Sequence, residues 1–183
     1  MSADATVLAV DDEPDLAELY RVYLDAAYDV RIATDGDEAL SEMDASVDVV
    51  LLDRRMPGMS GHEVLEEIRG EGYDARVAML TAVEPDVDIV EMPFDDYKTK
   101  PVTKEDLLTL VEVLLYRAAF DERSQEFFAL ASKKAALEAA GETDTDGYEE
   151  IIERLESVRV EVDDVLDHLS TRDAFVEVPG EAP

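Results

Sequence analysis

Three carboxylates in the sequence follow short apolar runs, which makes them candidates for chemistry. Asp11 and Asp12 come after the run Thr6–Val10, and Asp53 directly follows the run Val47–Leu52. A short apolar run bounded by turn residues is typical of a buried parallel strand. Ligands of an open parallel sheet bind beyond the carboxyl ends of its strands. The three carboxylates are therefore predicted to meet at one edge of a sheet, provided that the two strands are neighbours.

Such a cluster predicts a bound cation, because carboxylates held close together repel and raise one another's pKa. An all-oxygen site with room for water suits Mg²⁺, which usually takes one or two protein carboxylates. Two further polar residues follow predicted strands: Thr81 ends a strand over 76–82, and Lys100 comes after one over 94–97. A nucleophilic carboxylate, a hard cation, a hydroxyl and an ammonium together are suited to phosphoryl transfer, with Asp53 as the attacking group.

Each of these residues also has an ordinary structural explanation. Asp53 could cap the turn that follows its strand. Thr81 could simply end a strand, Tyr97 could be a half-exposed strand aromatic, and Lys100 could be a solvated surface charge. The functional interpretation depends on all of them occurring together, in this order and spacing.

The elements that must position these residues alternate between strand and helix. Apolar runs predict five strands, and 3.6-residue periodicity predicts helices between them, with Pro14 at the first position of one helix and Thr103 with Asp106 as a capping box for the last. This alternation predicts an α/β domain with a flavodoxin-like, doubly wound, five-stranded parallel sheet. A helical hairpin or coiled-coil element is expected after it.

The ordered set of residues resembles the receiver domains of two-component response regulators. The resemblance covers about residues 4–118, so residues 1–118 are assigned to a receiver domain. It is carried by these segments: Asp11-Asp12, Asp53 with Met56-Pro57-Gly58 and Gly61, Thr81-Ala82, and Tyr97 before Lys100-Pro101.

The resemblance implies that Asp53 accepts a phosphoryl group from a sensor histidine kinase. Mg²⁺ would be bound by Asp12, Asp53 and the backbone carbonyl of Arg55, with Asp11 acting mostly through water. Thr81 and Lys100 would contact phosphoryl oxygens, Tyr97 would move inward on activation, and the Lys100–Pro101 bond would be cis. Such a protein is not an enzyme in the usual sense, because it catalyses only its own phosphorylation and slow dephosphorylation.

Two features depart from the receiver pattern. Arg54 and Arg55 follow the phosphoacceptor, where apolar or small polar residues are commoner in the family. We expect the Arg55 side chain to lean over the phosphoryl group and slow its hydrolysis. The interval from Thr81 to Lys100 is also short, and Pro85 and Pro93 bracket a helix of only one or two turns, close to the marginal limit for a helix.

Residues 119–173 are predicted to form a helical output domain, followed by a flexible tail over 174–183. Residues 141–147 are predicted to be a turn or linker. The helix expected after them has an apolar a/d seam over three heptads: Tyr148, Ile151, Leu155, Val158, Val162, Val165 and Leu169. The segment 127–134 resembles the HalX domain that follows receivers in halophilic archaea. His62 and His168 are interpreted as helix-surface residues rather than ligands.

Three kinds of output stay open for this region. The first is transcriptional control through protein contacts, with a possible homodimer through the helices. The second is direct DNA binding, which the net acidic charge and the absence of a helix-turn-helix pattern disfavour, since phosphate-driven binding weakens steeply with salt. The third is a structural adaptor whose receiver is inactive.

The composition indicates the salt concentration and the compartment in which the protein works. The formal net charge is −31 over 183 residues, with 47 acidic and 16 basic residues, and the acid is spread along the whole chain. Self-repulsion of this size destabilises a compact state in dilute buffer and is screened at molar salt. With no cysteine and no apolar stretch long enough to span a membrane, the sequence predicts a cytoplasmic protein of a salt-accumulating halophile, without membrane contact.

Overall fold

The computed structural model describes residues 5–82, 89 and 91–173. The chain divides into two compact units, Met1–Leu115 and Tyr116–Pro183, and the division falls within one long helix. The sequence placed a domain boundary three residues later, at 118/119, and that boundary stays a prediction. The short helix expected between Pro85 and Pro93 lies largely outside the described residues, as does the tail over 174–183.

The first unit is built on a five-stranded sheet in the order β2-β1-β3-β4-β5, in which all neighbouring strands are parallel. This confirms the predicted doubly wound fold class, with β1 and β3 as neighbours. The strands are β1 (Thr6–Val10), β2 (Asp29–Ala33), β3 (Val47–Leu52), β4 (Arg76–Thr81) and β5 (Asp96–Thr99).

The helices are α1 (Pro14–Leu24), α2 (Gly36–Glu42), α3 (Gly61–Gly70), α4 (Lys104–Ala140) and α5 (Asp146–Asp173). Their starts follow local chemistry. Pro14 occupies the first turn of α1, the Asp35 side chain accepts from the Glu38 N–H at the start of α2, and Thr103 with Asp106 forms the predicted capping box before α4.

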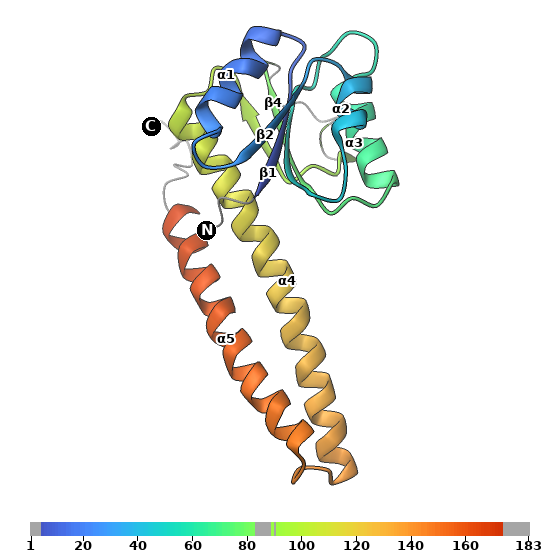
Figure 1. The fold of residues 1–183 in the computed structure, drawn as a ribbon, viewed down its shortest axis with the longest axis vertical. Coiled ribbons are helices and arrows are strands. Elements are labelled where there is room, and N and C mark those ends of the chain that lie inside the picture. The colour runs from blue at the N-terminus through green and yellow to red at the C-terminus, as the bar shows by residue number, and fades with distance from the viewer. Residues whose placement is uncertain (1–4, 83–88, 90, 174–183) are drawn as a thin grey trace, which may run out of the picture. The chain divides into compact units, whose positions relative to one another are not determined.

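The sheet has an apolar core on each face, because successive side chains of a strand point to opposite sides. Leu8, Val50 and Leu52 pack with residues of α2 and α3 on one face, whereas Val7 and Val49 pack with α1 and the first turns of α4 on the other. Figure 1 shows this arrangement, with α2 and α3 on one side of the strands and α1 with the start of α4 on the other. These two layers bury the central strands on both faces.

The fifth strand begins later than the sequence indicated, at Asp96 rather than at Phe94. The reason is Asp95, whose N–H donates to the Val77 carbonyl oxygen at 2.7 Å while its carboxylate accepts from the Val77 N–H at 2.8 Å. The same carboxylate pairs with Arg69 and Arg76 at 2.9 Å each. These contacts hold Asp95 in a bend, so the regular pairing starts at Asp96, two residues after Phe94.

In the second unit, the part of α4 from Tyr116 onward and α5 form an antiparallel pair (Figure 1). Glu126 of α4 pairs with Arg154 of α5 at 2.7 Å, and the rings of Tyr116 and His168 stack with centroids 5.0 Å apart. Val158 of the predicted seam is fully buried, and the other seam residues are half-buried. The predicted C-terminal helical region is thus confirmed.

Candidate functional site

The candidate site lies at the carboxyl edge of the sheet, where three strands end. Val10 of β1 pairs with Leu52 of β3, so the residues that follow them are side by side, and the Asp53 N–H donates to the Val10 carbonyl oxygen at 2.9 Å. Thr81 is the last residue of β4 and is fully buried. The Lys100 N–H donates to its carbonyl oxygen at 2.8 Å, which joins the ends of β4 and β5.

Lys100 connects two of the predicted carboxylates across this edge. Its Nζ donates to Oδ2 of Asp11 at 2.6 Å and to Oδ2 of Asp53 at 2.8 Å. The side chains are 11% exposed for Lys100, 1% for Asp11 and 9% for Asp53, so these ion pairs are largely removed from water. At such burial a charge without a counter-charge would be costly. The ammonium therefore offsets the repulsion between the two acids.

The remaining carboxylate oxygens are oriented by the backbone. Oδ1 of Asp11 accepts from the Glu13 N–H at 3.0 Å, and Oδ1 of Asp53 accepts from the Arg55 N–H at 3.1 Å. Each acid thus has one oxygen on a main-chain donor and the other on Lys100. This double restraint fixes the direction in which the Asp53 carboxylate faces.

Burial and charge act against each other on the titration of this cluster. Desolvation raises the pKa of the Asp11 carboxyl, although the hydrogen bonds from Lys100 and from the Glu13 N–H oppose it. Burial works against the Lys100 ammonium, but the hydrogen bonds to Asp11 and Asp53 raise the pKa of Lys100 above its ordinary value. The lysine is therefore charged over the physiological range.

The cluster offers oxygen ligands for a metal ion. One carboxylate oxygen from each of Asp11, Asp12 and Asp53 lies within 4.8 Å of the other two. Carboxylate oxygens at this spacing, with the half-buried Asp12 at the rim, fit a hard divalent cation that keeps part of its water shell. The residues present are thus suited to Mg²⁺, and a second positive charge would relieve the crowding of acids that Lys100 alone offsets.

Gly61 allows the chain to pass close to the phosphoacceptor candidate. A Cβ at this position would lie 2.0 Å from the backbone carbonyl oxygen of Asp53, which no side chain could accept. The Gly61 N–H donates to the carbonyl oxygen of Arg54 at 3.0 Å and closes the loop between β3 and α3. The sequence motif contained this glycine, but only the structure shows what it touches.

The other predicted residues take different places. Tyr97 of β5 is half-buried, and its ring packs against Phe94 with centroids 5.6 Å apart. The side chain of Arg55 is exposed, and its backbone N–H contacts Asp53. The Lys100–Pro101 peptide bond is cis, as the resemblance implied. The roles assigned to Thr81, Tyr97 and the Arg55 carbonyl stay predictions.

Sequence reasoning missed Tyr20, which is buried on α1 and whose pKa is affected by the charged residues of the site. Burial raises the pKa of its hydroxyl to about 12, with Lys100 lowering it and Asp11 raising it by smaller amounts. The sequence placed Tyr20 in the apolar stripe of this helix and gave no sign that it lies near the carboxylates. Only the packing of α1 brings it near the carboxylates.

Comparison with known proteins identifies the class to which this fold and site belong. The family model for the response regulator receiver domain matches residues 7–112, and the HalX domain model matches residues 116–179. The chain belongs to the response regulator receiver family, with a HalX domain following the receiver. The resemblance found in the sequence is thereby confirmed.

Among curated relatives, a Haloferax volcanii protein named "Putative transcriptional regulator" is 49% identical over 164 residues. The sensory transduction protein RegX3 of Mycobacterium tuberculosis is 37% identical over 122 residues, which are 64% of this chain. The chain covers 28% of the first relative and 53% of the second. The halophilic source of the first relative and the HalX domain fit the acidic composition.

Solved structures match the receiver part. The receiver domain of a LuxO repressor protein from Vibrio parahaemolyticus aligns with a TM-score of 0.59 at 30% identity, covering 64% of this chain and 95% of that one. The response regulator TrrA from Thermotoga maritima, solved in complex with Mg²⁺ and BeF, aligns with a TM-score of 0.52 at 34% identity. That match covers 60% of this chain and 98% of TrrA.

Proposed function

We propose that this protein is a phosphorylation-switched regulator in which Asp53 accepts a phosphoryl group from a sensor histidine kinase. The observation that carries the proposal is the Lys100 ammonium held between Asp11 and Asp53, at 2.6 and 2.8 Å. An oxygen of the Asp53 carboxylate attacks the phosphorus of a phosphohistidine. The P–N bond breaks, its electron pair returns to the imidazole, and an acyl phosphate forms on Asp53.

The chain's own residues would organise this transfer. Lys100 and the Thr81 hydroxyl would each bind a phosphoryl oxygen, which is supported by the position of both residues at the carboxyl edge of the sheet. The Arg55 N–H, which donates to Asp53, would keep the attacking carboxylate in position. Mg²⁺ held by Asp11, Asp12, Asp53 and the Arg55 carbonyl would neutralise charge on the transferring group. The protein is thus a signalling module that promotes its own phosphorylation and slow dephosphorylation, rather than an enzyme acting on a separate product.

Helix α1 offers a surface for the kinase. It begins two residues after Asp12, and the side chains of Leu19 and Val22 are 38% and 53% exposed on it. Exposed apolar side chains one turn apart are suited to packing against a partner helix. We place this encounter in the cytoplasm, in keeping with the acidic composition and a cytoplasmic kinase domain.

The state of Asp53 would be passed on through Tyr97 to the helical HalX region, which acts in transcription through protein contacts. Direct DNA binding is the second candidate, favoured by the transcriptional names of relatives. Three basic residues of this region argue against it, because Arg123, Lys134 and Arg154 each pair with a glutamate within the region. An electrophoretic mobility shift assay at molar KCl distinguishes the two candidates, because the protein retards DNA under these conditions only if it binds DNA directly.

The test is intact mass measurement after incubation with acetyl phosphate and Mg²⁺. We expect the mass of one phosphoryl group to be added to the wild type and not to Asp53→Ala. Phosphorylation of Asp53→Ala to the same extent, or none in the wild type with Mg²⁺ present, would overturn the proposal. Omitting Mg²⁺ is the matched control, and sizing before and after phosphorylation tests for the homodimer.

A further inference from the structure

The helical hairpin of the second unit has two unlike sides. Its α5 helix packs on α4 through the a/d seam, so the residues that precede the seam positions and those that follow them lie on opposite sides of the hairpin. On the first side, Arg154 pairs with Glu126 at 2.7 Å. Glu161, seven residues further along α5, pairs with Arg123 at 2.8 Å. This side is therefore closed by ion pairs between the two helices.

The opposite side, which we call the open side, exposes apolar side chains. Ile152, Arg159 and Leu166 recur there every seven residues, each directly after a seam residue of α5. Ile152 is half-buried, and Leu166 is 41% exposed. On α4, Phe128 follows Glu126 by two residues and so lies about 200° around the helix from the ion-paired side. Phe128 is 69% exposed, so both helices present a large apolar side chain to water on the open side.

The open side is large enough for a stable protein interface. Helix α5 has 28 residues and is therefore about 42 Å long at about 1.5 Å per residue. Two helices packed about 10 Å apart present a strip about 20 Å wide, which gives an area of about 800 Å². A standard interface between proteins buries about 800 Å² on each partner. The open side therefore suits a protein of similar length rather than a small ligand.

The charges on this side complement those of a second copy of the chain. Arg159 and Asp163 are exposed neighbours on α5, and neither forms an ion pair among the residues that the structure describes. In a two-fold symmetric contact each residue meets its counterpart twice, so an antiparallel copy of α5 places each arginine opposite an aspartate. A two-fold axis that passes between these two residues also brings Leu155 of one copy close to Leu166 of the other.

We propose that two chains associate through their open sides, so that the two hairpins form an antiparallel four-helix bundle. Leu155 and Val162 of the seam, which are half-buried in one hairpin, join the core of this bundle. The exposed Phe128 and Leu166 become covered. The inference rests on the part of the proposed function that places a homodimer in the helical region, and it assigns that dimer a face and an orientation. It does not require phosphorylation of Asp53.

Light scattering after size exclusion at molar KCl measures the mass of the unphosphorylated full chain. We expect twice the chain mass at about 100 μM protein, since interfaces of this size have dissociation constants that are micromolar or lower. Leu166→Gln and Phe128→Gln should each raise the dissociation constant at least about tenfold, because every dimer loses two covered apolar side chains. Val160→Gln is the matched control. Val160 is 69% exposed, but it follows the buried Val158 by two residues and lies on the outer side of α5, so this variant should stay dimeric.

Charge reversal tests the orientation of the two copies. Arg159→Asp and Asp163→Arg should each weaken the dimer several-fold, more at reduced KCl than at molar KCl, and the double exchange should restore it. A double exchange that fails to restore the dimer would overturn the antiparallel arrangement. A dimer that survives both Leu166→Gln and Phe128→Gln, or that Val160→Gln weakens equally, would overturn the choice of face.

Asp53→Ala separates this inference from the phosphorylation of the receiver. The variant cannot accept a phosphoryl group at this position and should dimerise like the wild type, so a failure of phosphorylation leaves the result intact. A wild type that stays monomeric would overturn the proposal, whether another segment of the chain or a different protein covers the open side.

Discussion

Lys100 stands where repulsion between Asp11 and Asp53 would otherwise be strongest. Replacing it by alanine leaves two largely buried carboxylates without their counter-charge. We expect Lys100→Ala to lower the free energy of unfolding by about 3 kcal/mol, and added Mg²⁺ to restore part of it. Urea unfolding at fixed KCl, with and without Mg²⁺, measures both effects.

Lys98 offers a matched control for this substitution. Its ammonium pairs with Asp106 at 3.1 Å on the surface, with a side chain that is 43% exposed. Exposed pairs contribute at most about 1 kcal/mol, so Lys98→Ala should change stability little and should not respond to Mg²⁺. Equal losses in the two variants would show that Lys100 does not compensate the buried acids.

Arg55 is the second test at the scale of single residues. Its backbone N–H donates to Asp53 and its side chain is exposed. We expect this side chain to reach over an attached phosphoryl group. We expect Arg55→Ala to shorten the lifetime of the acyl phosphate several-fold, because water then has freer access. Loss of the phosphoryl mass from phosphorylated protein over time measures this lifetime. An equal or longer lifetime in the variant would contradict the shielding role.

At the scale of elements, the loop between β3 and α3 places the phosphoacceptor. A Cβ at Gly61 would lie 2.0 Å from the carbonyl oxygen of Asp53, so the loop has to shift to admit it. We expect Gly61→Ala to lower the free energy of unfolding by about 2 kcal/mol and to slow phosphorylation of Asp53. Thermal unfolding and intact mass measurement with acetyl phosphate follow the two effects.

Gly70 at the other end of α3 serves as the control, because nothing lies within 4 Å of a Cβ built there. Alanine is the better helix former, so Gly70→Ala should leave stability unchanged or raise it by up to about 1 kcal/mol. Phosphorylation should proceed at the normal rate. A similar loss of phosphorylation in both glycine variants would show that contact with Asp53 is not the cause.

The start of α4 depends on an ionised carboxylate. Hydrogen bonds from the N–H and hydroxyl of Thr103, with Lys98 assisting, lower the pKa of Asp106 from 3.8 to about 2. A depressed pKa in the folded state means that this stabilisation is present above pH 3.8 and is lost as the pH falls toward 2. The contribution is screened, because the side chain is 36% exposed.

We therefore expect Asp106→Ala to cost about 1 kcal/mol at neutral pH. The difference from the wild type should shrink as the pH falls through the range between 3.8 and about 2. Thermal unfolding of both proteins across this range at fixed KCl gives the difference directly. A difference that stays constant with pH would mean that the capping interaction does not need the charged form.

The whole molecule is governed by its net charge of −31. The Debye length falls from about 10 Å at 0.1 M salt to about 3 Å at 1 M, so repulsion among surface acids is progressively screened. We expect the midpoint of thermal unfolding to rise steadily between these concentrations, with NaCl and KCl acting alike. A midpoint that is flat or falls with salt would show that self-repulsion does not limit stability.

Much of this molecule followed from local patterns. The buried strands β1 and β3 and the acids after them were evident because a continuous apolar run ends at charged residues. The seam of α5 was evident because apolar residues recur at helical spacing. Both patterns arise from neighbours in the chain, which is why reading along the sequence could find them. The match of two family models to residues 7–112 and 116–179 agrees with that interpretation.

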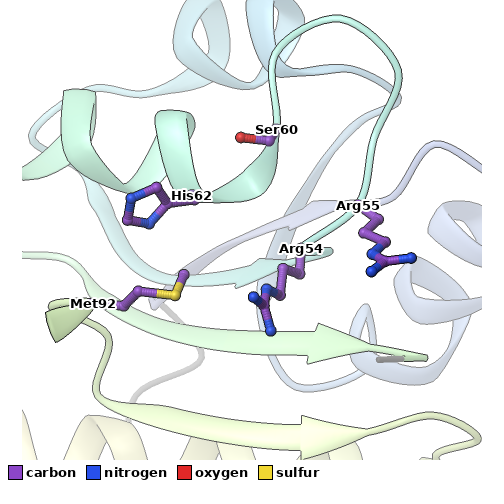
Figure 2. A pocket seen from close by; sticks show the side chains of 5 residues that line it. All are labelled: Arg54, Arg55, Ser60, His62 and Met92. Atoms are coloured by element: carbon purple, nitrogen blue, oxygen red, sulfur yellow. The ribbon is translucent and has the colours of Figure 1, made fainter. Parts of the chain in front are cut away.

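Tertiary structure alone decided the contacts that give the site its chemistry. Lys100 meets Asp11 across 89 positions and Asp53 across 47, and the place of a flexible ammonium depends on sheet order rather than on its neighbours in sequence. The later start of β5 depends on the two arginines that bind Asp95. A pocket lined by Arg54, Arg55, Ser60, His62 and Met92 (Figure 2) also depends on the tertiary structure, because Met92 meets the other four residues only after the chain has folded.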